Sequence, residues 1–569
     1  MKVCNDTSTF SLGGWINVGV DNIRLFIWMS LFAMMWFTYR AWQIDYPAVP
    51  VTVPIEQGAA TAPELAPVRA PADTLPALTE PAVSAEVPVL TASEPERVIR
   101  VRTDVFDLMI DPQGGDIVRT DLPLFPVDKD RPDEPIRLLD FTPDNRWVFQ
   151  TGFRGIAEGE EPNHLATFTS ARDEYVLGDD DDELVVTLNW QYEGPLRAQK
   201  IYTFRRGQYG IQLNLTLENQ ADVSWSGVPY VQLFRHHIPV KRSYTSVDSY
   251  SFTGPVLYDG DRYEKLDVDD LVTDPVNQEL AGGWLASIQH HFLAAAVPPA
   301  EDVVRYQAIT RGSDYLLTAL SREVREISPG ESLTYPVQLF IGPKLQDQLA
   351  VTGNELELTV DYGKLTILSQ PLFWLLTKIH GYVNNWGWSI IIVTVLIKLA
   401  FYKLTQTSGR SMAKMRKLQP RMKALQERFK DDRQALSQAM MELYKREKVN
   451  PAAGCLPILI QMPFFFAFYW VLIESVEIRQ APFMFWITDL SSRDPYFILP
   501  LLMGAAMLLQ TRLNPAPPDP VQAKVMQIMP VAFTALFAFF PAGLVLYWLT
   551  NTALSILQQW RINQVIGTS

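Results

Sequence analysis

Lys398 is the side chain whose surroundings most demand a chemical explanation, because it stands inside the apolar run SIIIVTVLIKLAFYKLT. If a helix crosses a bilayer from Trp386, a rise of 1.5 Å per residue places Lys398 about 18 Å deep, with roughly 10 Å left to the other surface. A lone ammonium facing lipid at that depth costs about 3 kcal/mol or more. The side chain must therefore extend toward the surface, pair with another group, or face a wet cavity.

Other polar or amphipathic side chains interrupt the apolar runs that accompany Lys398. Each one alone is explained by a hydrogen bond between helices. Together, and without an acidic residue at matching depth in the other late runs, they favour a wetted cavity inside a five-helix bundle. The residues predicted to line this groove and contact a substrate are Lys398, Thr394, Gln461, Gln527, Tyr547, Trp548 and Asn551.

The sequence lacks the patterns of common enzyme sites. It contains no GxxxxGK[ST], HExxH or GxSxG motif. The two cysteines, Cys4 and Cys455, form no CxxC pair, and the two pairs of adjacent histidines fall in strand-like sequence, where neighbouring side chains point to opposite faces. We therefore expect a protein that is not an enzyme, with no metal site, no cofactors and no catalytic residues.

Six apolar runs approach the roughly 20 residues that a helix needs to cross a bilayer. Between Lys403 and Lys448 the loop after the second run carries 13 basic and 5 acidic residues, which places it in the cytoplasm by the positive-inside rule. Counting helices from this loop puts both termini in the cytoplasm. The expected spans are an anchor at 23–42, too aromatic for a cleaved signal peptide, and helices at 386–405, 455–472, 496–513, 525–540 and 542–557.

The rest of the 569 residues divides by composition. The net charge of −14 argues against general nucleic-acid binding. Ten of the 41 prolines lie between 47 and 95, so 43–96 is expected to be a semi-rigid linker. Alternating stretches such as LVVTLNWQY and IQLNLTL predict an all-β sandwich at 97–350, outside the cytoplasm. The predicted fold class is a membrane α-helical bundle with six transmembrane helices plus this large extracytoplasmic β-sandwich, with cytoplasmic ends at 1–22 and 558–569.

Two further segments have helical periodicity. The segment 362–385 is too short and too mixed in polarity to span a bilayer. This favours an amphipathic helix that lies in the interface on the outer side of the membrane, although a buried linker helix fits the same pattern. The apolar repeat at intervals of three and four residues in 406–450 predicts a cytoplasmic helical hairpin. Its two apolar stripes pack on each other or meet an apolar partner. Its basic face attracts anionic lipid or ribosomal RNA, or is simply solvated. The residues selected in this hairpin are Met412, Met415, Lys417, Met422 and Met440.

Long collinear motifs in this chain resemble the YidC family of membrane-protein insertases in its long Gram-negative form. They include LTVDYGKLTILSQPLF, NNWGWSIIIVTVLIK, VNPAAGCLPILIQMPFFFAFY and FPAGLVLYWLTN, and the resemblance covers the chain from the first anchor to the last helix. The resemblance implies an inner-membrane insertase and chaperone with a periplasmic β-sandwich and a groove open to the cytoplasm and to lipid. It also implies, as partners, nascent membrane-protein clients, the Sec translocon, the ribosome and membrane lipids.

The chain departs from the family pattern at several positions. Lys398 stands where the family usually has Arg, and Tyr547-Trp548 replaces a common Tyr-Tyr pair. A YPLT-like stretch reads Tyr402-Lys403-Leu404-Thr405. The segment after Arg561 has no Lys or Arg, so ribosome docking through the tail is not expected.

Two other classes of protein remain open on the residues alone. A membrane-anchored protein that binds or modifies sugars would carry its function in the sandwich, although no site stands out there. A small transporter or channel would use Lys398 as a substrate site, but the six runs show no internal repeat.

Overall fold

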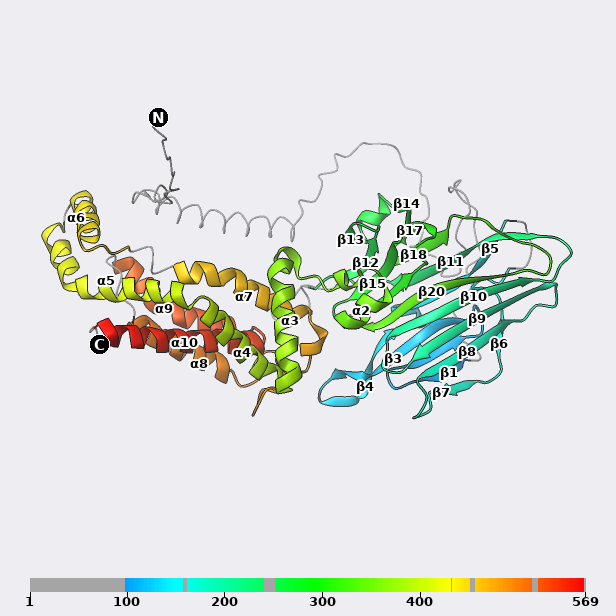
Figure 1. Cartoon of the computed structure of the whole chain (residues 1–569), viewed down its shortest axis with the longest axis horizontal. Helices are drawn as coiled ribbons and strands as arrows, with labels where there is room; N and C mark the ends of the chain where they lie inside the picture. Colours follow the sequence, from blue (N-terminus) through cyan, green and yellow to red (C-terminus); the bar gives the residue numbers. More distant parts are fainter. Residues whose placement is uncertain are drawn as a thin grey trace, which may run out of the picture. The chain divides into compact units, whose positions relative to one another are not determined.

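A computed structural model describes residues 98–156, 161–239, 251–430, 432–450, 456–513 and 520–566 of the chain. The expected N-terminal end, the anchor at 23–42 and the linker at 43–96 lie outside these residues. Figure 1 shows the described elements, which are mostly strands up to Pro343 and helices after it.

Three sheets make up the N-terminal part. The nine-stranded sheet has the order β13-β12-β15-β16-β20-β10-β9-β8-β6, and the six-stranded sheet has the order β14-β17-β18-β11-β19 with β5 paired to β11. A five-stranded sheet has the order β4-β3-β2-β1-β7. The strands are β1 (Ile99–Arg102), β2 (Asp107–Asp111), β3 (Asp116–Asp128), β4 (Arg131–Leu139), β5 (Trp147–Gly155), β6 (Phe168–Ser170), β7 (Glu174–Val176), β8 (Glu183–Trp190), β9 (Leu196–Arg205), β10 (Gly210–Asn219), β11 (Trp225–His236), β12 (Thr253–Tyr258), β13 (Tyr263–Lys265), β14 (Val276–Ala281), β15 (Trp284–Gln289), β16 (Phe292–Val297), β17 (Val303–Arg311), β18 (Asp314–Ser321), β19 (Arg325–Ile327) and β20 (Ser332–Pro343).

The strand pattern in the sequence agrees with the burial in this domain. Side chains of β10 alternate between buried and half-buried over nearly its whole length, as a strand with one face on a core requires. A hydrogen bond of 2.6 Å between the hydroxyls of Ser287 on β15 and Tyr315 on β18 joins the nine-stranded and six-stranded sheets. The prediction of a β-sheet-rich domain is therefore confirmed.

Helices follow the last strand. They are α2 (Gln346–Thr352), α3 (Thr366–Val383), α4 (Trp386–Ala400), α5 (Tyr402–Arg428), α6 (Arg433–Arg446), α7 (Leu456–Glu474), α8 (Ile498–Leu513), α9 (Pro520–Phe537) and α10 (Ala542–Ile566). In the parts of the chain that are described, no helix by itself has both the length and the hydropathy to cross a bilayer, but α4 and α5 taken together do, by length and composition.

The boundaries of two helices differ from the sequence expectation. The run expected as one helix at 386–405 ends at Ala400, and Tyr402 begins α5 at an angle of 70° to α4. Tyr402 to Thr405 thus belong to the helix that continues into the basic segment. At the other end of the chain, α10 runs on to Ile566, well past the expected boundary at 557.

Helices α5 and α6 form a hairpin (Figure 1). This hairpin has its own small core. The buried side chains of this core are Leu418, Met422, Met440, Leu443 and Val449, and Met415 packs against them. The two apolar stripes therefore pack on each other, as the first alternative predicted. Met412 is half-buried and does not belong to this cluster.

Helix α3 has one packed face and one exposed face. Leu372 and Leu376 are buried, whereas Trp374 and Tyr382 are 61% and 91% exposed. Exposed aromatic side chains beside an apolar packed face suit a membrane interface. The position of this helix in such an interface stays a prediction.

Candidate functional site

The ammonium of Lys398 lies in a cleft between α4, the start of α5 and the second half of α10. Its Nζ donates a hydrogen bond of 2.7 Å to Ser555 Oγ on α10. Ser555 Oγ in turn donates to the carbonyl oxygen of Asn551 at 2.8 Å. Lys398 is thus held by a neutral hydroxyl from another helix and keeps donor capacity for a further partner.

The cleft is positively charged. Its cavity has a volume of about 330 Å³, and Lys398, Arg410 and Arg561 line it together with apolar side chains. No carboxylate occurs among the described residues that line it. Three cations with no carboxylate among the described lining residues favour an anionic group as the occupant.

Polar side chains on α10 continue the Lys398 site along one face of the helix. Asn551 Nδ2 donates to Gln461 Oε1 on α7 at 3.4 Å, and Gln558 Nε2 donates to Thr405 Oγ1 on α5 at 3.0 Å. Asn551, Ser555 and Gln558 follow one another at intervals of four and three residues, so they share a face of α10. This spacing is visible in the sequence and could have identified Ser555, which the sequence analysis did not select.

Four of the predicted groove residues lie outside this hydrogen-bonded set. Thr394 is buried, and its hydroxyl donates to Ile390 O within its own helix at 2.7 Å. Tyr547 is buried and stacks on Phe468, with ring centroids 4.8 Å apart. The other two are Trp548, whose ring packs edge-on against Phe465, and Gln527, which is exposed on α9.

The hairpin contributes one contact near the end of α10. Lys417 Nζ on α5 donates to the carbonyl oxygen of Ile566 at 2.5 Å. A cation at the last carbonyls of a helix is favourable because these groups have no partner inside the helix. Lys417 therefore has a contact within the chain itself.

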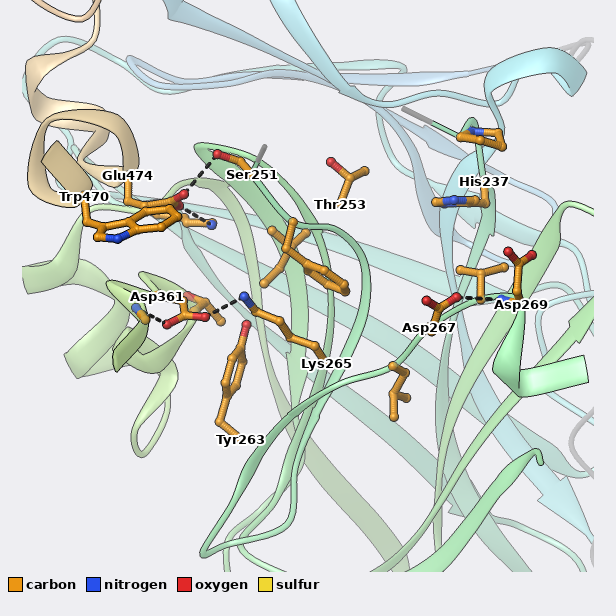
Figure 2. Close-up of a pocket in the computed structure, with 18 residues that line it drawn as sticks. His237, Ser251, Thr253, Tyr263, Lys265, Asp267, Asp269, Asp361, Trp470 and Glu474 are labelled. Carbon is orange, nitrogen blue, oxygen red and sulfur yellow. Dashed lines mark hydrogen bonds and ion pairs between the residues drawn. The ribbon is translucent and has the colours of Figure 1, made fainter. Parts of the chain in front are cut away.

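A second cavity lies where strands of the β-domain meet the end of α7 (Figure 2). Its volume is about 580 Å³, and Trp470 and Glu474 of α7 line it. Both of its lysines are engaged: Lys265 Nζ is 2.5 Å from Asp361 Oδ2, and Lys344 Nζ is 3.9 Å from Glu474 Oε2. This cavity therefore lacks the uncompensated positive charge of the cleft at Lys398.

The fold and the cleft define a class of protein in which a β-sheet domain precedes a bundle of short apolar helices that holds a basic cleft. Comparison with known proteins identifies the class further. Residues 98–375 match the model of the YidC periplasmic domain, and residues 378–568 match that of the 60Kd inner membrane protein. The chain belongs to the YidC family of membrane protein insertases.

Relatives match over nearly the whole chain. The membrane protein insertase YidC of Thioalkalivibrio sulfidiphilus is 46% identical, covering 96% of this chain and 99% of the relative. That of Nitrosococcus oceani is 44% identical with the same two coverages. Among solved structures, an active YidC insertase with its first transmembrane domain resolved is 20% identical over 82% of this chain and 94% of the other, with a TM-score of 0.37.

These matches confirm the family, the insertase function and the expectation that the chain is not an enzyme. They also confirm an inner-membrane family with a periplasmic domain. The six-helix topology, the groove residues and the partners other than membrane-protein clients stay predictions.

Proposed function

We propose that this insertase receives the hydrophilic part of a client in the cleft at Lys398 and releases the client's apolar segment into the membrane. The observation that carries the proposal is the set of three cations, Lys398, Arg410 and Arg561, around one cavity without a carboxylate among its described lining residues. An acidic segment that enters the cleft exchanges water for these cations.

The cleft lowers the barrier because a polar segment held there has less hydrocarbon left to cross. Transfer of the client's apolar side chains into lipid then supplies the driving force, at about 25 cal/mol for each Å² removed from water. Leu508 and Leu509 on α8 and Phe466 on α7 are exposed, which suits a surface along which such a segment slides into lipid. No nucleotide is needed for this step.

The topology that fits the proposal has six transmembrane helices, of which the first is the anchor at 23–42. Both termini and the α5–α6 hairpin lie in the cytoplasm. The five later spans are 386–405, 455–472, 496–513, 525–540 and 542–557, and the first of these includes the bend between α4 and α5. The β-domain lies in the periplasm, and α3 lies in the outer interface.

Further partners belong to the proposal as well. The Sec translocon would share some clients, and nascent chains would arrive from the ribosome. The basic side chains exposed on the hairpin would contact either the ribosome or anionic lipid.

Insertion assays on the full chain in proteoliposomes test the role of Lys398. We expect Lys398→Ala to reduce insertion of a client with an acidic tail about tenfold, and Lys398→Arg to retain activity, because guanidinium keeps the charge. Lys403→Ala is the matched control, since Lys403 is exposed on α5 and does not line the cleft. Equal insertion by the wild type and Lys398→Ala would refute the electrostatic role.

Crosslinking separates the proposed path from the other functions considered. A photoreactive group at 394, 398 or 548 should label a stalled nascent chain if the client passes along this bundle. Removal of the β-domain should leave insertion largely intact, whereas a sugar-directed function would be lost. Solute flux through vesicles that contain the purified chain would instead indicate a transporter or channel.

A further inference from the structure

We infer that the outer part of the cleft, which is nearest the cytoplasm in the proposed topology, binds the headgroup of an anionic phospholipid. The headgroup is held between Arg410 of α5 and Arg561 of α10. The inference rests on the proposed function for the placement of the cleft at the membrane surface. It adds a ligand class, a phosphodiester with acyl chains, to a cleft proposed above to receive acidic client segments.

The two arginines are available for a ligand. Both are exposed, both line the cavity, and neither has an ion pair with another residue in the described part of the chain. Guanidinium groups bind phosphate oxygens through two parallel N–H donors, and they are less strongly hydrated than ammonium groups. Both arginines line one cavity of about 330 Å³, so a phosphate bound there has two guanidinium groups in its surroundings.

The apolar walls favour a lipid over a free phosphate. Leu399, Leu557 and Val565 line the same cleft, and they are 61%, 59% and 79% exposed. Leu399 and Leu557 belong to the proposed membrane spans, where acyl chains lie beside them, so a phosphate bound in this cleft can belong to a lipid whose chains cover these aliphatic side chains. Cations beside exposed aliphatic side chains thus match both parts of an anionic amphiphile.

The cleft has room for two levels of binding along α10. Arg561 follows Ser555 by six residues, which is about 9 Å along the helix axis. The lipid phosphate lies at the level of the arginines, and Lys398 remains at the level of Ser555 for the client. An anionic lipid at the outer level would compete with an acidic client segment for entry, so the anionic lipid content of the membrane would tune which clients enter.

Native mass spectrometry of the full chain from nanodiscs of mixed phosphatidylglycerol and phosphatidylcholine tests the site. We expect the wild type to retain phosphatidylglycerol in preference to phosphatidylcholine. In Arg410→Gln/Arg561→Gln the ratio of the two bound lipids should be about tenfold lower. Lys414→Gln/Lys423→Gln removes the same charge from exposed positions of α5 outside the cleft and should keep the preference. Equal loss in both double variants would overturn the site in favour of general surface attraction.

Two further measurements keep the outcomes distinct. Arg410→Lys/Arg561→Lys retains the charge without the bidentate geometry, so its lipid preference should lie between those of the wild type and the glutamine variant. It tests the site independently if the glutamine variant folds poorly. Competition by inorganic phosphate at millimolar concentration would show that a free anion suffices and would overturn the lipid assignment. Unchanged insertion in Lys398→Ala with intact lipid preference would refute only the client site.

Discussion

Glu474, the last residue of α7, faces the buried ammonium of Lys344 just after β20, with 3.9 Å between Oε2 and Nζ. Glu474 Oε1 also accepts a hydrogen bond of 2.9 Å from Ser251 Oγ. Burial lowers the pKa of Lys344 to about 8, and the charge of Glu474 opposes that shift. A buried charge pair thus joins the β-domain to the helices at the cavity shown in Figure 2.

Glu474→Gln should destabilise the chain by about 3 kcal/mol, because it leaves the Lys344 ammonium buried without its counter-charge. Thermal unfolding of the purified protein in detergent measures the effect. The double variant Lys344→Met/Glu474→Gln should recover most of the loss, since no buried charge is left unpaired. Additive losses in the double variant would contradict a coupled pair.

The buried carboxyl of Glu477, near the same junction, should make the stability of the fold depend on pH. Burial raises the pKa of its carboxyl from 4.5 to about 7, and its Oε2 has no hydrogen-bond partner in the described part of the chain. A carboxyl whose pKa is higher in the folded state binds more protons there than in the unfolded state between pH 4.5 and 7. The free energy of unfolding should therefore fall across this window as pH rises, by a few kcal/mol at most.

Glu477→Gln should remove this fall, because the amide does not titrate. Unfolding midpoints of the two proteins would then diverge between pH 5 and pH 7, with the variant more stable at the higher pH. Parallel pH curves for the wild type and the variant would contradict the assignment.

Ser555 should matter for insertion through its contact with Lys398. Ser555→Ala removes the acceptor of the 2.7 Å hydrogen bond, and we expect insertion of acidic-tail clients to fall about fivefold, equivalent to about 1 kcal/mol. Ser555→Thr keeps a hydroxyl and should stay close to the wild type. A client with a neutral tail should respond less, so an equal loss for both clients would point to a packing defect instead.

The α5–α6 hairpin should unfold locally when its small core is weakened. Met440→Ala removes a buried side chain from a cluster that is separate from the other cores. It should therefore lower the free energy of unfolding of the hairpin by about 2 kcal/mol or more. Hydrogen exchange should rise in α5 and α6 while the β-domain stays protected. Met412→Ala, outside the cluster, is the control and should change exchange little.

Much of the architecture follows from local patterns in the sequence. The two-residue alternation in β10 identifies a buried strand, and the spacing of Met415, Leu418 and Met422 identifies the packed face of α5. These periods depend only on the geometry of one strand or one helix. The position of Lys398 in an apolar run likewise marks it as a special cation without any tertiary information.

Partners across helices required the tertiary structure. Ser555 lies 157 residues after Lys398, and their contact depends on which faces α4 and α10 turn toward each other. The rotation of α9 and α10 about their own axes likewise decides that Gln527 is exposed and that Tyr547 stacks on Phe468 of α7, although both were expected in the groove. The bend between α4 and α5, at a point without proline or glycine, brings Arg410 to the same cleft as Lys398. Sequence by itself determined which residues are unusual for their segment, and only the packing of the helices decided which of them meet, because side-chain direction is set by rotations that no local period records.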